Sequence, residues 1–300
     1  MELEFKPVVA GDIDRLRPFY GLRPNKTCDS VFLDSFLWKD YYHVQCAVSE
    51  GRAVLWLMEK DGQVSTAMPL CREEDLPYFF QQMVDYFSGV LHKPFYISLA
   101  DEEAVQCLNL DPALFEVEEQ VDLKDYLYSG EELRKLEGKK FVKKRNHLNG
   151  FKRTYEGRYE YRRLCCSDRH EVWQFMERWR QHKEEVGAME LSLDYEVAGI
   201  HDILKNCSSL YVRMAGVYID GQLEAFTIGS LNVRENMAVI HIEKANPEIR
   251  GLYQFINQQF LINEFPEAEL VNREDDVGME GLRKAKMSYC PIGFARKYMV

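Results

Sequence analysis

The sequence predicts an α/β protein in which mixed β-sheets are covered by helices and arranged as two related halves. Its 300 residues are long for one compact domain and suit two domains of about 150 residues each. Two Asp-Gly pairs, at 61–62 and 220–221, lie between runs of strand-forming residues, which is typical of tight hairpin turns. Helical patterns follow these hairpins, which excludes an all-β class. We place an N-terminal domain over 1–125 and a C-terminal domain over 126–300, joined near 120–130.

The first half begins with a helix, followed by three strands. Residues 30–42 (SVFLDSFLWKDYY) are typical of a helix, and Glu50-Gly51 separates the first two strands. The turn at 61–62 leads into the third strand, and an aromatic-rich helix follows it. The expected elements, in order, are a helix over 30–42, strands over 43–49, 53–59 and 64–70, a helix over 74–87, and strands over 94–99 and 115–119.

The second half repeats this style and contains the clearest helix of the chain. Over 168–185, Val172, Phe175, Met176 and Trp179 recur at the i, i+3, i+4, i+7 positions that share one helical face. The expected elements after it are a helix over 193–205, strands over 210–219, 223–231 and 237–243, a helix over 252–265, a strand over 269–272, a helix over 279–288 and a strand over 294–299.

The composition is that of a globular chain. Hydrophobic residues make up 46% and charged residues 29%, which excludes dominant disorder. No apolar run reaches the roughly 18 residues that span a bilayer, and the N-terminus does not resemble a secretory signal, so we expect a cytoplasmic protein without an integral membrane segment. The eight cysteines contain no CxxC spacing, and we expect them to be reduced thiols. Dinucleotide, P-loop, serine-hydrolase and zinc-protease motifs do not occur.

Positive charge is concentrated in one block of an acidic protein. The formal net charge is -11, yet residues 134–163 contain twelve Arg or Lys and three acidic residues, so this window is +9 and the rest of the chain is -20. Such a block is a candidate site for a phosphate-bearing cofactor, a nucleic-acid backbone or an anionic lipid surface. The alternative is a solvated basic helix that balances acidic neighbours.

The segment from residue 239 to 260 combines a strand with a helix start. In a strand, Val239, His241 and Glu243 share one face, and the isoleucines between them share the other. The strand runs into Arg250-Gly251 at the expected start of a helix, where free backbone N–H groups and an arginine favour an anion. The alternative is an ordinary loop and helix start.

Polar residues also follow the strand expected over 269–272. Residues 272–276 (NREDD) lie at the end of that strand, where ligands bind in many open sheets, and Lys286 and Tyr289 come from the next helix and its end. This set is suited to binding an amine or to proton transfer. We do not predict a metal site, because adjacent carboxylates alternate in direction along the chain.

Three segments together carry a family resemblance. They are Gly138-Lys139-Lys140 with Lys144-Arg145-Asn146-His147, then His241-Ile242-Glu243-Lys244-Ala245, and Asn272-Arg273-Glu274-Asp275-Asp276 with Gly281-Leu282-Arg283-Lys284-Ala285-Lys286. With these residues the chain resembles, over nearly its whole length, a bacterial family of unknown function related to the C-terminal domain of phosphatidylglycerol lysyltransferase. The resemblance implies two tandem GNAT-like (acyl-CoA N-acyltransferase) domains. Relatives of that arrangement transfer aminoacyl groups from tRNA to lipid or peptidoglycan precursors.

The resemblance also implies different roles for the two halves. In a GNAT-like domain, strands splay in mid-sheet and a helix start beside the gap receives a pyrophosphate. The second half offers Arg250-Gly251-Leu252-Tyr253 there, of which only Arg250-Gly251 matches the usual motif. In the first half, Glu73, Glu74 and Asp75 precede the comparable helix and would repel a pyrophosphate. We therefore expect the first half to be structural or to shape the acceptor site.

The function that these observations favour is transfer of an acyl or aminoacyl group. The donor is expected to be an acyl-CoA or an aminoacyl-tRNA, with no tightly bound cofactor, and the acceptor a small-molecule, peptide or lipid-headgroup amine or hydroxyl. We predict Glu243 as the base, assisted by His241, with Tyr289 as the acid and a backbone N–H of Ala245 or Asn246 stabilising the oxyanion. The donor site is expected at Lys144, Arg145, Arg250, Gly251 and Tyr253, and the acceptor site at Asn272, Glu274, Asp275 and Lys286.

A second hypothesis from a different class remains open. The basic block alone would suit a non-catalytic module that holds RNA or a phosphorylated metabolite.

Overall fold

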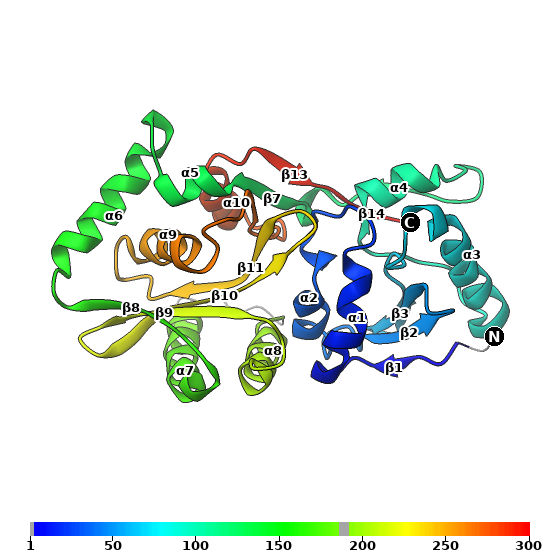
Figure 1. Ribbon diagram of the computed structural model, residues 1–300, viewed down its shortest axis with the longest axis horizontal. Helices are drawn as coiled ribbons and strands as arrows, with labels where there is room; N and C mark the ends of the chain where they lie inside the picture. The colour runs from blue at the N-terminus through cyan, green and yellow to red at the C-terminus, as the bar shows by residue number, and fades with distance from the viewer. Residues whose placement is uncertain (1–2, 186–191) are drawn as a thin grey trace.

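The computed structural model describes residues 3–185 and 192–300, which form two halves lying side by side (Figure 1). Helices α1 to α4 belong to the first half, and α5 to α10 belong to the second. The expected mixed α/β architecture is confirmed. Within the described residues, no helix has both the length and the apolar character needed to cross a bilayer.

The first half is built on a four-stranded sheet with the strand order β1-β2-β3-β4. β3 is covered on both faces: Val54 and Trp56 pack with α1 and α2, whereas Ala53 and Leu55 pack with α3, as the two-residue period of a strand requires. The elements are β1 (Lys6–Pro7), η1 (Ala10–Asp12), α1 (Ile13–Tyr20), η2 (Cys28–Ser30), α2 (Phe32–Leu37), β2 (Gln45–Ser49), β3 (Ala53–Lys60), β4 (Gln63–Ser65), η3 (Glu73–Asp75), α3 (Leu76–Tyr86), η4 (Phe87–Leu91), β5 (Ala100–Asp101), α4 (Glu102–Leu108), β6 (Glu118–Glu119) and η5 (Val121–Leu123).

The second half is built on a seven-stranded sheet with the order β13-β7-β12-β11-β10-β9-β8. Helices α7 and α8 cover one face, and α5, α6 and α9 cover the other (Figure 1). The elements are β7 (Asp125–Ser129), α5 (Gly130–Lys135), η6 (Lys139–Phe141), α6 (Val142–Thr154), β8 (Tyr159–Arg163), η7 (Cys166–Asp168), α7 (Arg169–Glu185), α8 (Ser192–Asn206), β9 (Arg213–Ile219), β10 (Gln222–Asn232), β11 (Met237–Ala245), α9 (Leu252–Glu264), β12 (Leu270–Asn272), α10 (Glu280–Met287), β13 (Gly293–Ala295) and β14 (Lys297–Met299).

One hydrophobic core continues from the first half into the second. Phe36 and Leu37 of α2 belong to the same buried cluster as Ile203 of α8 and Phe226 of β10. The two helices approach so closely that a Cβ atom on Gly199 would lie 2.2 Å from the Leu37 carbonyl oxygen. The halves are therefore packed through their cores, and residues at this interface have a defined geometry.

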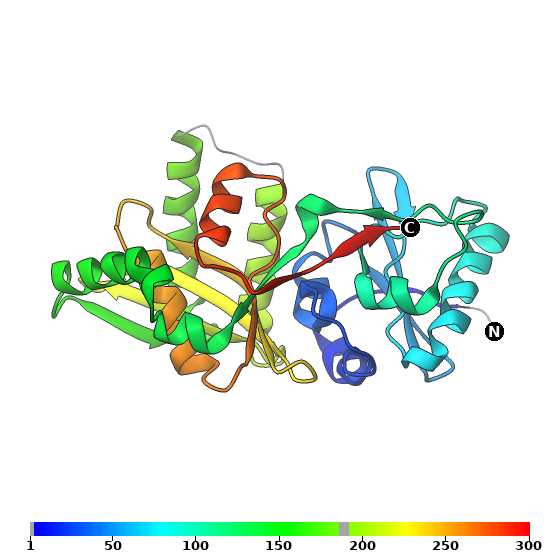
Figure 2. The same ribbon diagram turned by 90° about the horizontal axis from the view of Figure 1, so that it is seen from above.

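The C-terminal segment returns to the first half. β13 pairs with β7 in the seven-stranded sheet, but β14 lies between β5 and β6 in a three-stranded sheet, and Figure 2 shows this strand reaching across. The single strand expected over 294–299 is therefore wrong. The segment bends at Arg296, because its two ends pair with strands that belong to different halves.

Most other expected elements form within a few residues of their predicted bounds, but three in the first half do not. The strand expected over 64–70 is shorter, since β4 ends at Ser65 and Leu70 forms only an isolated bridge with Val54. The helix expected over 30–42 is shorter, since α2 ends at Leu37 and turns follow it. The strand expected over 94–99 forms only an isolated bridge between Ile97 and Thr66. The backbone of Ile97 bonds instead to Val300 at the far end of the chain, at 2.8 and 2.9 Å, a partner that a local pattern does not reveal.

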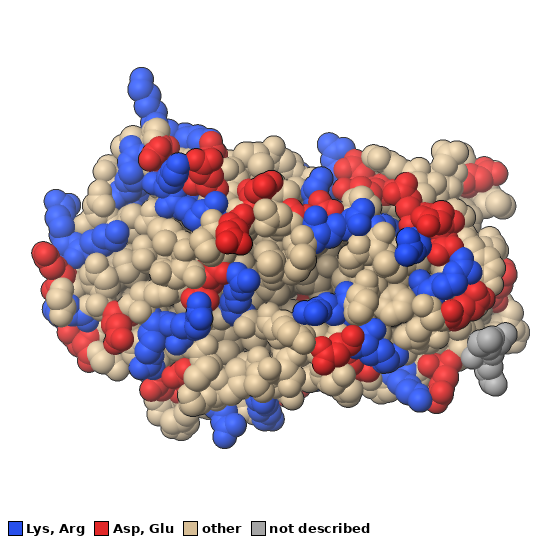
Figure 3. Space-filling model, in the orientation of Figure 1, with Lys and Arg blue, Asp and Glu red and all other residues tan. Residues whose placement is uncertain are grey.

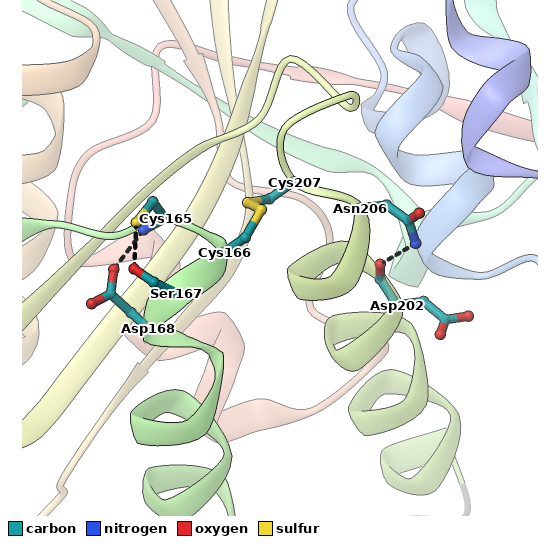
Figure 4. The surroundings of a disulfide bond; sticks show 7 residues. All are labelled: Cys165, Cys166, Ser167, Asp168, Asp202, Asn206 and Cys207. Carbon is teal, nitrogen blue, oxygen red and sulfur yellow. Dashed lines mark hydrogen bonds between the residues drawn. A yellow bond between two sulfur atoms is a disulfide. The ribbon is translucent and has the colours of Figure 1, made fainter.

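One pair of cysteines corrects the expectation of reduced thiols. Cys166 of η7 and Cys207, just after α8, form a disulfide (Figure 4). They lie 41 residues apart in sequence, and the packing of α7 against α8 brings them together. The remaining cysteines are free thiols, among them the neighbouring Cys165.

Candidate functional site

A β-bulge at His241 changes which side chains of β11 share a face. Ile228 of β10 faces Ile242, whereas the next residue, Gly229, faces Ile240, so His241 is the extra residue on β11. Ile240 consequently packs in the core under α9, and Ile242 packs in the core with α7 and α8. The expectation that these two isoleucines share one face is wrong.

The bulge also separates the two polar residues that the strand pattern had paired. His241 turns away from Glu243: its Nε2 lies 2.8 Å from Ser230 Oγ of β10, and its Nδ1 lies 2.9 Å from Oε1 of Glu274, which follows β12. Glu243 turns toward α9, where Asn257 donates a hydrogen bond to its Oε2 at 2.8 Å. The expected shared face is therefore wrong, and His241 does not contact the carboxylate it was expected to assist.

β11 and β12 run side by side for only a short distance and then part. Their parallel ladder extends from Met237 to Val239, and β12 ends at Asn272. The next residue, Arg273, donates its backbone N–H to Tyr126 of β7 at 3.1 Å and so follows β7 away from β11. β11 itself continues for six residues beyond Val239, to Ala245. A gap between neighbouring parallel strands is thus built into the second half.

The side chains in this gap form a polar network in which the negative charge of Glu243 is paired with the positive charge of Arg273. Arg273 Nη2 lies 2.9 Å from Glu243 Oε1, and the two side chains are only 13% and 9% exposed. The Arg273 guanidinium also stacks 4.7 Å from the centre of the Tyr289 ring. Burial raises the pKa of Tyr289 to about 12, so its hydroxyl keeps its proton at neutral pH. Glu243 is held by Arg273 on one oxygen and Asn257 on the other.

Lys144 of α6 approaches the same network. Its Nζ lies 3.8 Å from the centre of the Tyr289 ring and donates a hydrogen bond to Ser288 at 2.6 Å. Burial, with the positive charge of Arg273 nearby, lowers the pKa of Lys144 to about 8. The neutral form of this amine is therefore more accessible near neutral pH than that of an ordinary lysine.

The start of α9 packs directly against α6. Gly251 has φ 90°, and a Cβ atom there would lie 2.3 Å from the His147 carbonyl oxygen, so both the backbone conformation and the close approach require glycine. Arg250 is exposed, with Nη2 3.5 Å from His147 Nε2. Burial and the charges of Arg250 and Lys144 lower the pKa of His147. The expected cationic helix start therefore exists, with α6 as its second wall.

Both backbone groups expected to stabilise an oxyanion have partners. The N–H of Asn246 donates to the Glu224 carbonyl oxygen at 2.8 Å, and the N–H of Ala245 donates to the Tyr253 hydroxyl. Tyr253 reaches from α9 past the end of β11 and also bonds Trp179 of α7. Its hydroxyl occupies the position that an acyl oxygen would need in order to meet Ala245.

The predicted acceptor residues lie together after β12, but two of them serve the backbone. Asn272 donates to Asp125 at 3.0 Å and accepts the Glu274 N–H at 2.7 Å. The buried Lys286 donates to the Arg273 carbonyl oxygen at 2.6 Å and also to that of Asp275. Burial raises the pKa of Asp275 to about 6. The other two residues of this set make side-chain contacts instead: the Glu274 carboxyl group contacts His241, and that of Asp275 lies 3.7 Å from the Lys297 ammonium.

Most of the basic block is engaged within the protein. Arg145, a predicted phosphate ligand, donates to the carbonyl oxygens of Leu136 and Gly138. Other members pair with carboxylates, as Lys140 does with Glu132 at 2.7 Å. In the part of the chain that the structure describes, the members with neither an ion pair nor a hydrogen bond are Lys139, Lys143, Lys152 and Arg153. Figure 3 shows Lys and Arg side chains gathered at the end of the molecule where α6 lies.

A buried charge cluster at the contact between the halves was missed by sequence reasoning. Lys297 of β14 is 1% exposed, with Nζ 2.8 Å from Asp125 Oδ1 and 3.2 Å from Cys28 Sγ. Asp29 and Asp275 lie 3.8 and 3.7 Å from the same ammonium. Lys297 and Cys28 are 269 residues apart, so no local spacing could indicate their contact.

Part of this cluster has the spacing of a metal site but not its chemistry. One ligand atom from each of Cys28, Asp34 and Glu274 lies within 4.8 Å of the others. Burial and the nearby Asp125 raise the pKa of the Cys28 thiol, which disfavours the thiolate that a metal requires. The Lys297 ammonium also lies against the sulfur. These residues do not fit a metal ion.

Comparison with protein families identifies the chain. A family model described as phosphatidylglycerol lysyltransferase, C-terminal, matches residues 21–300. The chain belongs to this family. The match extends over both halves and includes the parted strands, the start of α9 and the segment after β12.

Individual relatives cover the chain to different extents. An uncharacterised protein of Mycoplasmoides gallisepticum is 28% identical over 177 residues, which is 59% of this chain and 55% of that protein, so the match spans about half of the relative. A crystal structure of a conserved protein of unknown function from Bacteroides thetaiotaomicron has a TM-score of 0.90 at 28% identity and covers 99% of both chains.

More distant structures establish the fold. The C-terminal domain of a candidate lysylphosphatidylglycerol synthetase from Agrobacterium fabrum has a TM-score of 0.69 at 17% identity, covering 97% of this chain and 91% of that one. A tandem GNAT protein from the clavulanic acid biosynthesis pathway has a TM-score of 0.52 at 10% identity, with coverage of 100% and 98%. The expected tandem GNAT-like fold of this family member is confirmed.

Proposed function

We propose that the protein is an acyl- or aminoacyltransferase that moves an acyl group from a CoA thioester or an aminoacyl-tRNA to an amine or hydroxyl. The observation that carries the proposal is the parting of β11 and β12 beside the start of α9. An acyl chain can enter a sheet only where two strands separate, and cations at a helix start suit the phosphates of either donor. Membership of the lysyltransferase family supports the same reaction class.

Glu243 is the proposed base at this gap. The acceptor's nitrogen or oxygen attacks the acyl carbonyl carbon, and its proton passes to Glu243 directly or through water. The tetrahedral intermediate then collapses, the C–S or C–O bond to the donor breaks, and the leaving group takes a proton from Tyr289. The raised pKa of Tyr289 keeps its hydroxyl protonated at neutral pH, so a proton is present beside the leaving group. The Arg273 and Asn257 contacts fix the direction of the Glu243 carboxylate.

We assign the other predicted residues to binding the donor, binding the acceptor or positioning the residues that do so. Arg250, with Lys144 beside it, would bind the donor phosphates at the start of α9. Gly251 lets α6 pack against that start, and Arg145 and Tyr253 shape the walls. Glu274 and Asp275 would face the acceptor. Asn272 and Lys286 hold the chain that carries those carboxyls. His241 acts through Glu274, which it orients from the opposite face of β11.

The test compares Glu243→Gln with Glu248→Gln, an exposed glutamate five residues away. Each variant is assayed for release of CoA from acetyl-CoA and for loss of the aminoacyl group from charged tRNA in the presence of amine acceptors. We expect Glu243→Gln to lower transfer by about a hundredfold or more while thermal unfolding stays cooperative. Full activity in Glu243→Gln would contradict its assignment as the base, and loss of activity in Glu248→Gln would show that the effect is not specific.

The four unpaired cations of the basic block favour a second candidate, RNA binding without catalysis. A thermal-shift panel of acetyl-CoA, bare tRNA and aminoacyl-tRNA separates the candidates, because a bound ligand raises the melting temperature. Equal stabilisation by charged and uncharged tRNA favours binding alone. Preference for the charged form, or stabilisation by acetyl-CoA, favours transfer.

A further inference from the structure

The backbone groups first expected to hold the acyl oxygen are already bound within the protein. The N–H of Asn246 donates to the Glu224 carbonyl oxygen at 2.8 Å. The N–H of Ala245 donates to the Tyr253 hydroxyl. Attack on an acyl carbonyl turns its oxygen into an anion, and that charge needs a positioned hydrogen-bond donor. The donor must therefore come from a side chain at the gap.

Lys144 of α6 presents an ammonium group whose position is fixed but whose charge is not paired. Its Nζ donates to Ser288 Oγ at 2.6 Å, and Ser288 in turn donates to the Ala285 carbonyl oxygen. The centre of the Tyr289 ring lies 3.8 Å from the same nitrogen. Among the described residues, no carboxylate forms an ion pair with Lys144. Since an ammonium has three donors and Ser288 takes one, N–H groups remain for a ligand.

The charges around Lys144 leave this side of the gap with an excess of positive charge. Burial and the positive charge of Arg273 lower the pKa of Lys144 to about 8, and Cys290 and Glu243 oppose this shift without reversing it. The charge of Glu243 is balanced by Arg273, whose Nη2 lies 2.9 Å from its Oε1. A negative charge that forms beside Lys144 would therefore be stabilised, and it would raise the pKa of this amine.

The Tyr289 hydroxyl belongs to the same group of donors. Gln254 of α9 and Arg273 both donate hydrogen bonds to the Tyr289 oxygen, which partly offset the effect of burial on its pKa. With two donors on its oxygen, the hydroxyl directs its own proton away from both. In an acyl donor the carbonyl oxygen and the leaving atom are bonded to one carbon, so the groups that serve them must be neighbours, as Lys144 and Tyr289 are.

We propose that the Lys144 ammonium holds the acyl carbonyl oxygen and stabilises the negative charge of the tetrahedral intermediate, while Tyr289 serves the leaving atom beside it. The assignment rests on the transfer reaction proposed above and adds a catalytic residue to it. As the acceptor attacks, the carbonyl π electrons move onto the oxygen, which Nζ binds. As the intermediate collapses, they return to the carbonyl, the C–S or C–O bond to the donor breaks, and Lys144 keeps its proton throughout.

The first experiment measures kcat and KM for the donor in Lys144→Met and in Lys124→Met. Lys124 is the matched control, because it is half-buried with its Nζ 4.7 Å from the centre of the Phe294 ring and contacts β13. We expect Lys144→Met to lower kcat about a hundredfold and to change KM less than about threefold, since an oxyanion donor acts in the transition state. An effect confined to KM, or an equal loss of kcat in Lys124→Met, would overturn the assignment.

The pH profile adds a measurement that a merely structural role would not alter. Only the protonated amine can serve as this donor, so kcat/KM for the donor, measured at saturating acceptor, should fall as pH rises through about 8. Lys144→Arg keeps its charge throughout this range. It should retain more activity than Lys144→Met and lose the fall near pH 8. A fall that persists in Lys144→Arg would assign the titration to another group and overturn the proposal.

A binding experiment separates failure of this assignment from failure of the transfer reaction. Methylphosphonate, a tetrahedral oxyanion, is added to the full chain, and labelling of each lysine by acetic anhydride at pH 8 is followed by peptide mass spectrometry. We expect labelling of Lys144 to slow by about fivefold, because a bound anion favours the protonated amine, and labelling of Lys124 to stay unchanged. The protection should persist in Arg250→Met, which removes the arginine proposed to bind the donor phosphates.

The outcomes of the binding experiment are distinct. Unchanged labelling of Lys144, or protection that disappears in Arg250→Met, would overturn the assignment and leave the transfer reaction intact where transfer is observed. Protection of Lys144 in a chain that transfers no acyl group from any donor would contradict the proposed function and still support an oxyanion site at this amine.

Discussion

The two faces of β11 handle charge in opposite ways. On the α9 face, Glu243 is matched by Arg273 and Asn257, so the charge in the gap is compensated. On the face toward the first half, the buried Asp125 and the partly exposed Asp29 and Asp275 share the ammonium of Lys297. Asp34 forms no ion pair with any described lysine or arginine. The first arrangement fixes the direction of one carboxylate. The second gathers several carboxyl groups around one ammonium.

The largest effect on stability is expected from replacing Lys297, the cation of the charge cluster at the contact between the halves. This interface cluster consists of Lys297 with Asp29, Asp125 and Asp275. Lys297→Met leaves Asp125 buried with no charged partner, and the loss of one member of a buried ion pair costs about 3–5 kcal/mol. We expect this loss in the free energy of unfolding measured by urea denaturation. Arg158→Met, which breaks the exposed pair with Asp220, is the matched control and should change little. If Lys297→Met and Arg158→Met changed the free energy of unfolding equally, Lys297 would not be stabilising the negative charge of Asp125.

Replacing Arg273, the cation paired with Glu243, should lower stability less, because Asn257 still donates a hydrogen bond to Glu243. We expect Arg273→Met to lower the free energy of unfolding by about 3 kcal/mol. The double variant with Glu243→Gln should recover part of the loss, since the glutamine needs no counter-charge. Strict additivity of the two changes in urea denaturation would contradict a direct coupling across the gap.

Sequence reasoning succeeded where local patterns decide the structure. The apolar spacing from Val172 to Trp179 predicted α7, and the turn at Asp220-Gly221 predicted the hairpin of β9 and β10. It failed at the bulge, because Val239, Ile240 and Ile242 are all apolar and no alternation marks the extra residue.

The candidate site was predictable only in part, for a related reason. Glu243, Tyr289 and Lys144 were named from their segments, and the fold brings them to one gap. Asn257 and Lys297 were missed, since their roles depend on contacts between distant segments. Residue types indicate which chemistry is available, whereas register and crossover connections decide which groups meet.

A smaller effect is expected from neutralising Asp275 at the edge of the interface cluster. Its folded-state pKa of about 6 lies above the ordinary value of 3.8, so the folded protein binds more protons between these two values. Stability therefore falls as pH rises from about 4 to 6, and the penalty is complete above pH 6. Asp275→Asn should remove this slope and raise stability at pH 7 by about 2 kcal/mol, less than the full shift because the attraction to Lys297 is also lost.

The matched control for that change is Asp111→Asn. Asp111 is exposed, and its Oδ1 accepts a backbone N–H two residues ahead, as that of Asp275 does. Thermal unfolding between pH 4 and 8 should show a pH slope that is reduced in Asp275→Asn and unchanged in Asp111→Asn. A slope that persists in Asp275→Asn would assign the excess negative charge to other carboxyl groups of the cluster.

The smallest expected effect on stability comes from Tyr253. This change tests whether the Tyr253 hydroxyl blocks the Ala245 N–H at the gap between β11 and β12. Tyr253→Phe deletes the hydroxyl that accepts the Ala245 N–H and bonds Trp179. It should lower the free energy of unfolding by about 1 kcal/mol, the lower end of the net value of two hydrogen bonds. The ring remains to fill its place, so the packing of α9 against β11 persists. The freed N–H then points into the gap between the parted strands, available to an acyl carbonyl oxygen. Transfer should continue in this variant, and its abolition in a folded protein would instead make the Tyr253 hydroxyl part of the chemistry.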